Sequence, residues 1–587
     1  MSVVKTDVLV VGGGGAGLRA AIEASRQAVK TVLVSKGRPA RSGVTPLAGA
    51  DLALDGKSLH ELGFPGDPTD SKEKFFRDIV IQGFYLNNQK LVEAYVRDAP
   101  ARVKELIDWG MKVSASESRA VLTSGVEITD ALNRELKRSN VEIFEDIMVY
   151  ELLTRGGKVV GALGIDINSG EFIVFNSKAV VLATGGWHKA YYLNSGTPDM
   201  SGDGQAMAFK VGAELINMEM ITFCPNVIVW PPSLRGSIYL YVFHLFCGNI
   251  LNSLGENFME KYPKRIAEVG TRTEWNKLIL SIASMREILE GRGGPHGGVY
   301  FSLKGIPWED VEKSGILSFA PNWKFQGTDF SGLTQKLREG EMVEVAPAAH
   351  YFEGGIKINE KCETGIAGLY AAGECAAGLF GANRVAAATT EMLIQGAIAG
   401  KYAAEYAKRV NFTDFDEKQV ERFKEEALGP IKRREGVKLF ELKERLQRLA
   451  YDKVGVIRTA QDLSEAINEI SSIRKEKLPK LCTTTKVTEY NREWIECLEL
   501  KNMFLLVEIS ARAALLRTES RGVHYRSDYP YMDNNNWLKE LAAKNVNGEI
   551  VITSQPITVT TLKPPGGVMP FEESILKAIE ALETVGW

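Results

Sequence analysis

Apolar residues at the start of the chain form a short run that ends abruptly in glycines. Residues 8–17 read Val-Leu-Val-Val-Gly-Gly-Gly-Gly-Ala-Gly, and a helical pattern of apolar residues starts at Leu18. Gly12, Gly14 and Gly17 have the G-x-G-x-x-G spacing that joins a buried strand to a helix in dinucleotide-binding domains. The pattern therefore predicts a strand, a tight turn and a helix at the N-terminal end.

Two later segments repeat this order of an apolar strand followed by glycine. Residues 179–184 lead into Gly185-Gly186, and residues 368–374 read Gly-Leu-Tyr-Ala-Ala-Gly-Glu. A second strand is predicted over 31–36, and alternating apolar residues and glycines predict a hairpin region over about 141–178. Together these segments predict one Rossmann-like unit that is assembled from distant stretches of the chain.

The rest of the pattern predicts further domains, giving an α/β fold class. Residues 221–344 are aromatic and are interrupted by proline and glycine, which indicates an inserted α+β capping domain. Helices are predicted over about 386–408, 420–428, 439–449, 462–473 and 501–516, and β-rich sequence over 546–564 before a short terminal helix. The predicted boundaries are 1–220 and 345–415 for the Rossmann-like unit, 221–344 for the cap, 416–540 for a helical domain and 541–587 for a β-rich tail.

The glycines of the first motif suit the binding of a pyrophosphate. Gly12 permits the tight turn, Gly14 lets the backbone approach the phosphates, and Gly17 allows the helix to pack on the strand. The phosphates would accept hydrogen bonds from N–H groups at the helix N-terminus. Ser35 replaces the acidic residue that would bind a ribose hydroxyl at the end of the second strand. This favours FAD over NAD, so the Rossmann-like unit is predicted to be an FAD-binding domain.

Composition narrows the function classes. The chain has 587 residues, of which 45% are hydrophobic, and its net charge of −3 gives no global electrostatic case for binding nucleic acid. It has no apolar run of the roughly 20 residues that span a bilayer, and its first strand starts too early for a signal peptide. Six cysteines without a CxxC pair predict no zinc, iron–sulfur or other metal site in this chain. They are interpreted as buried free thiols of a cytoplasmic protein.

Several motifs in order resemble those of one family of flavoproteins. They are Ala183-Thr184-Gly185-Gly186, Ser201-Gly202-Asp203-Gly204, Pro347-Ala348-Ala349-His350-Tyr351, Gly381-Ala382-Asn383-Arg384 and the arginine-rich stretch from Arg517 to Pro530. With the opening glycine motif, they resemble the flavoprotein subunit of the fumarate reductase and succinate dehydrogenase family, which includes aspartate oxidases and adenylylsulfate reductases. The resemblance covers nearly the whole chain. It implies hydride transfer between FAD and a small carboxylate, and an iron–sulfur partner subunit through which the chain would meet a membrane only peripherally, on its cytoplasmic side.

The predicted flavin-binding residues belong to the glycine turns and their neighbours. They are Gly12, Gly14, Gly15, Ala16, Gly17, Ser35, Lys36, Ser42, Gly43, Gly49, Ala183, Thr184, Gly185, Asp203, Gly373, Glu374, Arg384, Ala387 and Thr389. Covalent members of the family carry a histidine within Arg-Ser-His-Thr, where this chain reads Arg41-Ser42-Gly43-Val44-Thr45. We therefore expect FAD to bind without a covalent bond. In the family such a bond favours succinate oxidation, so its loss favours reduction or another substrate.

The resemblance also assigns catalytic positions. His350 matches the substrate-binding histidine, and Arg384 matches the arginine that clamps a carboxylate, a task that suits a bidentate guanidinium. The proton-donating arginine of the family lies about 14 residues before the glycine of a Glu-Gly-Arg-Gly element, and that position holds Lys277. Arg272 and Arg286 are alternative donors, although Arg286 lies on an amphipathic stretch that favours a solvent-facing side chain.

Other substrate positions depart from the family. Glu353 replaces a neutral residue, and an ionised carboxylate beside His350 would repel a dicarboxylate, pair with a cationic group or raise the pKa of that histidine. The His-Pro-Thr segment of the cap is replaced by Cys224-Pro225-Asn226, and Arg-Gly-Glu-Gly-Gly is replaced around residues 244–248. Three functions stay open: a flavoprotein of the fumarate reductase type, a relative of the adenylylsulfate reductase or amino-acid oxidase type, and a non-catalytic flavin carrier.

Overall fold

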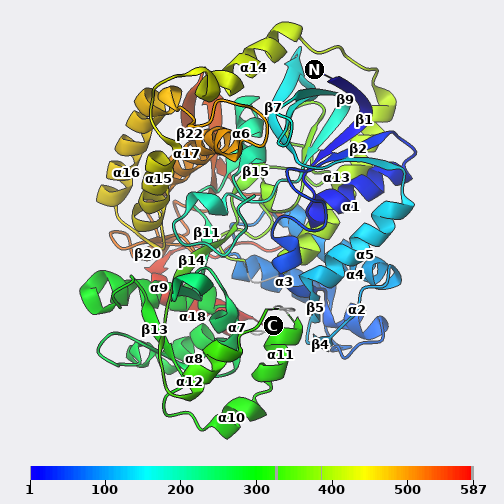
Figure 1. Ribbon diagram of the computed structural model, residues 1–587. Coiled ribbons are helices and arrows are strands. Elements are labelled where there is room, and N and C mark those ends of the chain that lie inside the picture. Colours follow the sequence, from blue (N-terminus) through cyan, green and yellow to red (C-terminus); the bar gives the residue numbers. More distant parts are fainter. Residues whose placement is uncertain (1, 324–327, 385–386, 583–587) are drawn as a thin grey trace.

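A computed structural model describes residues 2–323, 328–384 and 387–582 of the chain (Figure 1). The predicted start of the alanine-rich helix at residue 386 lies outside the described residues, and helix α13 spans Ala388–Arg409. In the part of the chain that is described, no helix combines the length and the apolar character needed to cross a membrane.

Strands from residues 2–182, drawn in blue and cyan in Figure 1, build most of a sheet of seven described strands. In order across the sheet they are β6 (Val141–Phe144), β2 (Thr31–Val34), β1 (Ser2–Val11), β9 (Phe172–Leu182), β8 (Lys158–Asp166) and β7 (Ile147–Arg155), with β16 (Leu369–Ala371) also paired to β9. The strands β6, β2, β1, β9 and β16 run parallel, whereas β7, β8 and β9 form the antiparallel region predicted over 141–178. The predicted α/β class is confirmed.

The parallel strands explain the apolar run that opens the sequence. Helix α1 (Gly15–Arg26) packs against α13 and contacts the sheet, and Val8 to Val11 are all buried. A parallel strand that is covered by other elements reads as a continuous apolar run, without polar residues at alternate positions. This arrangement directs the carboxyl ends of β1, β2, β9 and β16 to one edge, where their glycine turns meet.

The segment that follows forms a separate antiparallel sheet with helices around it, drawn in green in Figure 1. Its strands are β11 (Ile221–Trp230), β14 (Val343–Phe352), β13 (Val299–Ser302) and β12 (Asn249–Leu251), in that order. The helices that matter for the site are α7 (Tyr239–Phe246), α9 (Asn276–Glu287) and α11 (Ile316–Trp323). Strand β14 continues past the predicted boundary at residue 344, so the chain returns from the cap along a strand that belongs to the cap sheet.

Four helices follow in the region that was predicted to be helical. They are α14 (Glu417–Lys432), α15 (Leu439–Lys453), α16 (Ala460–Ser472) and α17 (Arg492–Leu516). The last begins nine residues before the predicted position, because Asn491 caps it by accepting a hydrogen bond from the Trp494 N–H at 3.0 Å. Its residues are buried on nearly all sides, which removes the amphipathic pattern that would have marked its start.

The C-terminal strands do not form a separate tail. Strands β21 (Lys539–Val546) and β22 (Glu549–Pro556) extend a sheet whose other members are β10 (Leu215–Ile216), β15 (Gly355–Lys357) and β17 (Ala376–Ala377). The prediction of β structure up to residue 564 was wrong beyond Pro556, and the terminal helix is α18 (Phe571–Ala581). The C-terminal hairpin thus shares a sheet with strands of the predicted FAD-binding domain.

Candidate active site

A cavity of about 470 Å³ lies where the carboxyl ends of the parallel strands meet the cap. Its walls come from the β1–α1 turn, the end of β2, residues 183–185 and 372–374, the start of α13 and the cap segments. Ligands of open α/β sheets bind at this edge of the sheet, in the crevice outside the strand ends.

The β1–α1 turn has the shape that a bound pyrophosphate requires. A Cβ at Gly12 would lie 2.2 Å from the Ala183 carbonyl oxygen, and one at Gly17 would lie 1.8 Å from the Gly12 carbonyl oxygen. These two glycines therefore allow close packing, whereas a Cβ at Gly14 meets nothing nearer than 3.5 Å. Gly14 is the N-cap of α1 and has no side chain to cap the helix, although the Gly15 N–H donates to Thr45 Oγ1 at 3.1 Å. The backbone at the start of α1 thus faces the cavity and fits a phosphate.

Most of the predicted flavin-binding residues line this one cavity. They are Gly12, Gly14, Gly15, Ala16, Ser35, Lys36, Ser42, Gly43, Gly49, Ala183, Thr184, Gly185, Asp203, Gly373, Glu374, Arg384 and Thr389. Gly17 and Ala387 do not line it. Gly17 packs helix on strand, and the Ala387 carbonyl accepts a hydrogen bond from Tyr95 Oη at 3.0 Å. The structure therefore brings together residues that lie up to 377 positions apart, from Gly12 to Thr389, on one wall.

Lys36 and Asp203, two of the predicted flavin-binding residues, are bound to each other on the cavity wall. Lys36 Nζ donates to Asp203 Oδ2 at 2.9 Å and to Glu499 Oε1 at 2.6 Å. Burial alone would raise the pKa of Asp203, but the ammonium group of Lys36 brings it below its usual value. Glu499 was not predicted, and the only sequence signal for it is an acidic residue within the largely buried helix α17.

Glu374 presents a carboxyl group in a buried part of the wall. Its Oε1 accepts the Phe352 N–H at 3.2 Å and lies 3.5 Å from Nε2 of His188. Burial raises the pKa of Glu374 to about 8. The group can therefore donate a hydrogen bond at neutral pH, which an ionised carboxylate cannot do.

At the cap end, Arg384 and His350 face the same space. The Arg384 guanidinium carbon lies 4.7 Å from the centre of the Tyr351 ring, and its Nε has no hydrogen-bond partner among the described residues. Burial disfavours its charge, but Glu274 and Asp51 nearby raise the pKa of Arg384 overall. His350, near the end of β14, holds its Nδ1 2.7 Å from Ser195 Oγ.

Lys277 lies on the opposite side of the cap end, in the first turn of α9. Its ammonium group forms an ion pair with Glu274, which also accepts a hydrogen bond from the Tyr241 hydroxyl. All three side chains line the cavity. We call Arg384, Lys277, Glu274 and Asp51 the substrate-end cluster. Glu274 and Tyr241 were not predicted, because neither lies in a motif of the resemblance.

Glu353 differs from its predicted position beside the substrate. It does not line the cavity, and its Oε1 accepts a hydrogen bond from the Thr222 hydroxyl in the buried interior. Burial raises the pKa of Glu353 to about 7. Residues on a strand alternate between faces, so a side chain three positions after His350 points to the other side of β14 and its continuation.

The alternative proton donors are placed differently. Arg272 lines the cavity at an exposed position, where its Nη atoms donate to the carbonyls of His244 and Gly248. Arg286 does not line the cavity, and its side chain, which was expected to face solvent, is half-buried. Its Nη atoms donate to the hydroxyls of Tyr262 and Tyr525, at 3.1 and 2.9 Å. Lys277 is thus the better placed of the three.

Apolar side chains complete the cap end of the cavity. Ile238, Leu245 and Phe246 come from α7 and the residue before it, and Phe319 comes from α11. The rings of Phe246 and Phe319 lie 5.4 Å apart, and Leu47 and Leu122 lie on the wall that the FAD-binding domain contributes. This end of the cavity is therefore partly apolar.

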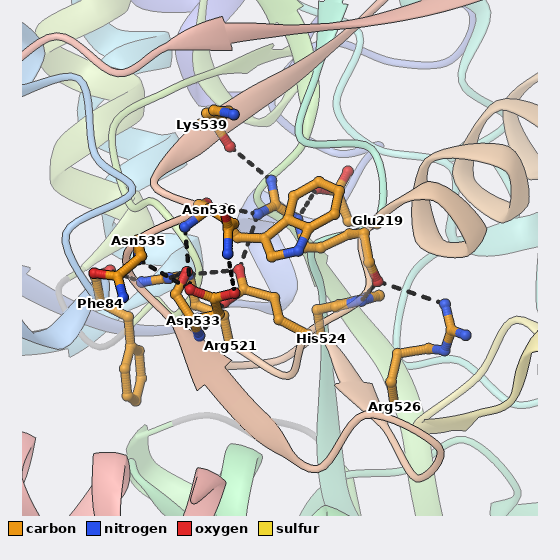
Figure 2. A network of polar contacts seen from close by, with 12 residues as sticks. Phe84, Glu219, Arg521, His524, Arg526, Asp533, Asn535, Asn536 and Lys539 are labelled. Carbon is orange, nitrogen blue, oxygen red and sulfur yellow. Dashed lines mark hydrogen bonds and ion pairs between the residues drawn. The ribbon is translucent and has the colours of Figure 1, made fainter. Parts of the chain in front are cut away.

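A second group of charges, the C-terminal ionic network, lies in the buried interior (Figure 2). Arg517 donates to Glu219 Oε1 at 2.7 Å and to Glu519 Oε1 at 3.0 Å, and Arg521 pairs with Glu519 at 2.8 Å. These four side chains have no exposed surface. Figure 2 shows Arg521 and Asp533 close together, with His524 and Arg526 alongside.

The same region reaches the segment that precedes Arg384. Val523 N–H donates to the Ala382 carbonyl at 2.8 Å, and Arg521 Nη1 donates to the Phe84 carbonyl at 2.9 Å. A Cβ at Gly522 would lie 1.9 Å from the Ala382 oxygen, so only glycine fits there. The C-terminal region therefore holds the backbone two residues before the candidate substrate arginine.

The side chains that could bind a metal ion are dispersed. Within the residues that the structure describes, no group of three or more His, Cys, Asp or Glu is arranged to hold a metal ion. All six cysteines are free and buried.

Comparisons with known proteins match the chain along most of its length. A family model described as "FAD binding domain" matches residues 7–390, and one described as "Fumarate reductase flavoprotein C-term" matches residues 443–571. A subunit of the fumarate reductase (CoM/CoB) of Methanothermobacter marburgensis is 33% identical over 545 residues, which cover 89% of this chain and 94% of the relative.

Solved structures resemble the chain equally broadly. Mycobacterium smegmatis Sdh1 in complex with UQ1 has a TM-score of 0.84 at 29% identity and covers 96% of both chains. A variant of E. coli quinol fumarate reductase FrdA also has a TM-score of 0.84, at 25% identity, over 96% of this chain and 99% of that one.

Proposed function

Because the chain belongs to the fumarate reductase and succinate dehydrogenase flavoprotein family, we propose that it passes a hydride between FAD and a small carboxylate substrate, in the direction of reduction. The chain is an FAD-dependent oxidoreductase. The substrate, the direction and the roles of individual residues are the proposal.

The FAD site fits the residues that are present. The backbone of the β1–α1 turn would hold the pyrophosphate, and Ser35 at the end of β2 would contact the adenosine ribose. FAD supplies hydride chemistry to the site when it is bound. Gly43 stands on the cavity wall at the position of the family's attachment histidine, which supports non-covalent binding.

Arg384 and His350 would bind and orient the substrate carboxylate. A guanidinium can donate two parallel hydrogen bonds to a carboxylate, and burial strengthens such bonds because water does not compete. The histidine, whose Nδ1 contacts Ser195, would donate from Nε2 to the same group or to its neighbour. Together they would also polarise a conjugated double bond toward hydride addition.

Lys277 would hold the proton that the substrate receives. Its ammonium group is on the cavity wall and is bonded to Glu274, which in turn accepts from the Tyr241 hydroxyl. This chain of hydrogen bonds could return a proton to Lys277 after each turnover. Lysine lacks the planar guanidinium of the family's arginine, so the proton would come from a point charge.

One observation carries the proposal: the glycine turn that fits a pyrophosphate, and an arginine that forms no ion pair within the described residues, open onto the same cavity. A pure flavin carrier would not need an unmatched buried cation beside its flavin, because such a charge is costly unless it binds something.

We also propose that electrons reach the FAD from an iron–sulfur subunit. The relative from Methanothermobacter marburgensis is named as one subunit of its enzyme, which supports a partner chain. The six free cysteines support a reducing compartment such as the cytoplasm.

The test is anaerobic reoxidation of the reduced holoenzyme. The FAD is reduced with a viologen dye, and fumarate, crotonate or adenylylsulfate is then added while flavin absorbance is followed. Reoxidation by an unsaturated carboxylate in the wild type, and its loss in an Arg384→Ala variant that keeps FAD, is the expected result. Reoxidation by adenylylsulfate alone, or by none of the three, would contradict the proposal.

A further inference from the structure

The cap end of the cavity offers one cation, Arg384, whose side chain forms neither an ion pair nor a hydrogen bond within the described residues. Arg384 forms no ion pair within the described residues, and its guanidinium lies over the Tyr351 ring. The carboxylate that it binds would therefore meet a positive charge that is free to accept it. Arg384 can therefore bind one carboxylate without giving up a contact with the protein.

The other cations at this end are already engaged. Lys277 is paired with Glu274, so the pair adds no net charge to the wall. Both Nη atoms of Arg272 donate hydrogen bonds to backbone carbonyls, those of His244 and Gly248. A second substrate carboxylate would have to break one of these contacts, and it would also meet the carboxyl groups of Glu274 and Asp51 on the wall.

The cap segments that differ from the family pattern do not supply a second cation to the cavity. Asn226 and His244 hydrogen-bond to each other at 2.7 Å in the buried interior, and neither lines the cavity. Burial lowers the pKa of His244 to about 3, so this histidine carries no charge at neutral pH. Cys224 is likewise buried away from the cavity.

Apolar side chains also line the cavity. Leu245, Phe246 and Phe319 lie on the cap wall, and Leu47 and Leu122 lie on the wall that the FAD-binding domain contributes. Phe246 is 42% exposed and Leu47 is 54% exposed, which leaves apolar surface that a ligand can cover. Such surface is stabilised by contact with an apolar group and not by a second carboxylate.

We propose that the substrate is a 2-enoic monocarboxylate with an alkyl or aryl group on its β-carbon, and not a dicarboxylate. This rests on the proposed function. In the reaction the β-carbon of the acid accepts a hydride from reduced FAD, and the α-carbon accepts a proton from Lys277. The carbon–carbon double bond becomes a single bond, the substrate gains two electrons, and FAD is left oxidised. The carboxylate stays on Arg384 throughout.

The experiment compares three acceptors with the viologen-reduced holoenzyme: cinnamate, crotonate and fumarate. We expect kcat/KM for cinnamate or crotonate to exceed that for fumarate by about tenfold or more. The oxidised enzyme is also titrated with 3-phenylpropionate and with succinate, and only the former should perturb the flavin spectrum at low concentration. A larger kcat/KM for fumarate would overturn this inference and leave the proposed function standing. Failure of all three acids would overturn both.

A charge placed on the apolar wall gives a second readout. Leu245→Arg should move the ratio of kcat/KM values toward fumarate by about tenfold or more, because it supplies the missing cation. Leu254→Arg is the matched control, since Leu254 is 67% exposed in the cap and does not line the cavity. Phe246→Arg replaces the first variant if that variant fails to retain FAD. An unchanged ratio in a variant that retains FAD would overturn the inference.

Discussion

Two groups of buried charges in this molecule differ in how their charges are matched. In the C-terminal ionic network, Arg517 lies between Glu219 and Glu519, and Arg521 shares Glu519, so each cation has an acidic neighbour. In the substrate-end cluster, Lys277 has Glu274 but Arg384 has no ion-pair partner within the described residues. The first group is closed to solvent, whereas the second opens onto a cavity.

The difference separates structural charges from binding charges. A buried ion pair contributes little net stability but is costly to break, because its remaining partner is left buried and alone. A cation left unmatched beside a cavity is stabilised only when an anion arrives. The network is therefore expected to hold the fold, and the cluster is expected to hold a ligand.

Removal of the unmatched cation should have the largest effect on activity. Arg384→Ala is expected to lower kcat/KM by roughly 10³-fold or more, which is about 4 kcal/mol, because the substrate carboxylate loses a charge-assisted bidentate partner. Steady-state kinetics with the flavin content checked by absorbance measures this. The exposed Arg445, which pairs with Glu469 at the surface, gives a control whose alanine variant should keep its activity.

Breaking the matched network should instead reduce stability. Arg517→Met leaves Glu219 and Glu519 without this cation, and we expect the free energy of unfolding to fall by about 3–5 kcal/mol. Urea titration followed by fluorescence measures the change, with Arg445→Met as the surface control at under about 1 kcal/mol. A loss as small as that of the control would show that the two groups do not differ as described.

Loss of Lys277, the proposed proton donor, should slow turnover more than it weakens binding. Lys277→Met is expected to reduce kcat by about 10²-fold or more while KM changes less, since a general acid acts in the transition state. Lys277→Arg should recover part of kcat because it retains a proton and a charge. Equal losses in both variants would argue that Lys277 only positions Glu274.

The smallest effect is a change in the pH dependence of stability. It concerns Glu353, a buried acid that belongs to neither group of charges. Burial raises the pKa of Glu353 from 4.5 to about 7. Between these values the folded chain keeps a proton that the unfolded chain releases, so the free energy of unfolding falls as pH rises from about 4.5 to 7. Glu353→Gln should flatten this slope by at most about 1.4 kcal/mol per pH unit. Denaturant titrations at several pH values test this, and an unchanged slope would contradict it.

The sequence predicted the glycine turns well, because their conformations depend on local residue types. Gly17 is required by a contact with Gly12 in the same turn, so the spacing of these glycines identifies the turn, although the contact that requires Gly12 is with the distant Ala183. The start of α17 was harder to predict from the sequence. Only the cap residue Asn491 marks it, and because the helix is buried on nearly all sides its sequence has no periodic apolar pattern. The C-terminal hairpin could not be placed, because its partner strand β10 lies more than 300 residues earlier.

The partners of the site residues were harder to predict than the residues themselves. Lys277 followed from its distance to a motif, but Glu274 and Tyr241 belong to no motif and meet it only in the folded cap. Glu353 was expected beside the substrate because of its closeness to His350 in sequence, yet it faces the interior. Sequence proximity does not determine which face of a strand a side chain occupies.

The hydrogen bond from Val523 to the Ala382 carbonyl has a consequence for protein engineering. This bond, made by a residue more than 130 positions downstream, positions the backbone that carries Arg384. The last third of the chain therefore cannot be exchanged as an independent module. A chimera that takes this third from a relative should first lose affinity for the substrate carboxylate, and only afterwards lose its bound FAD.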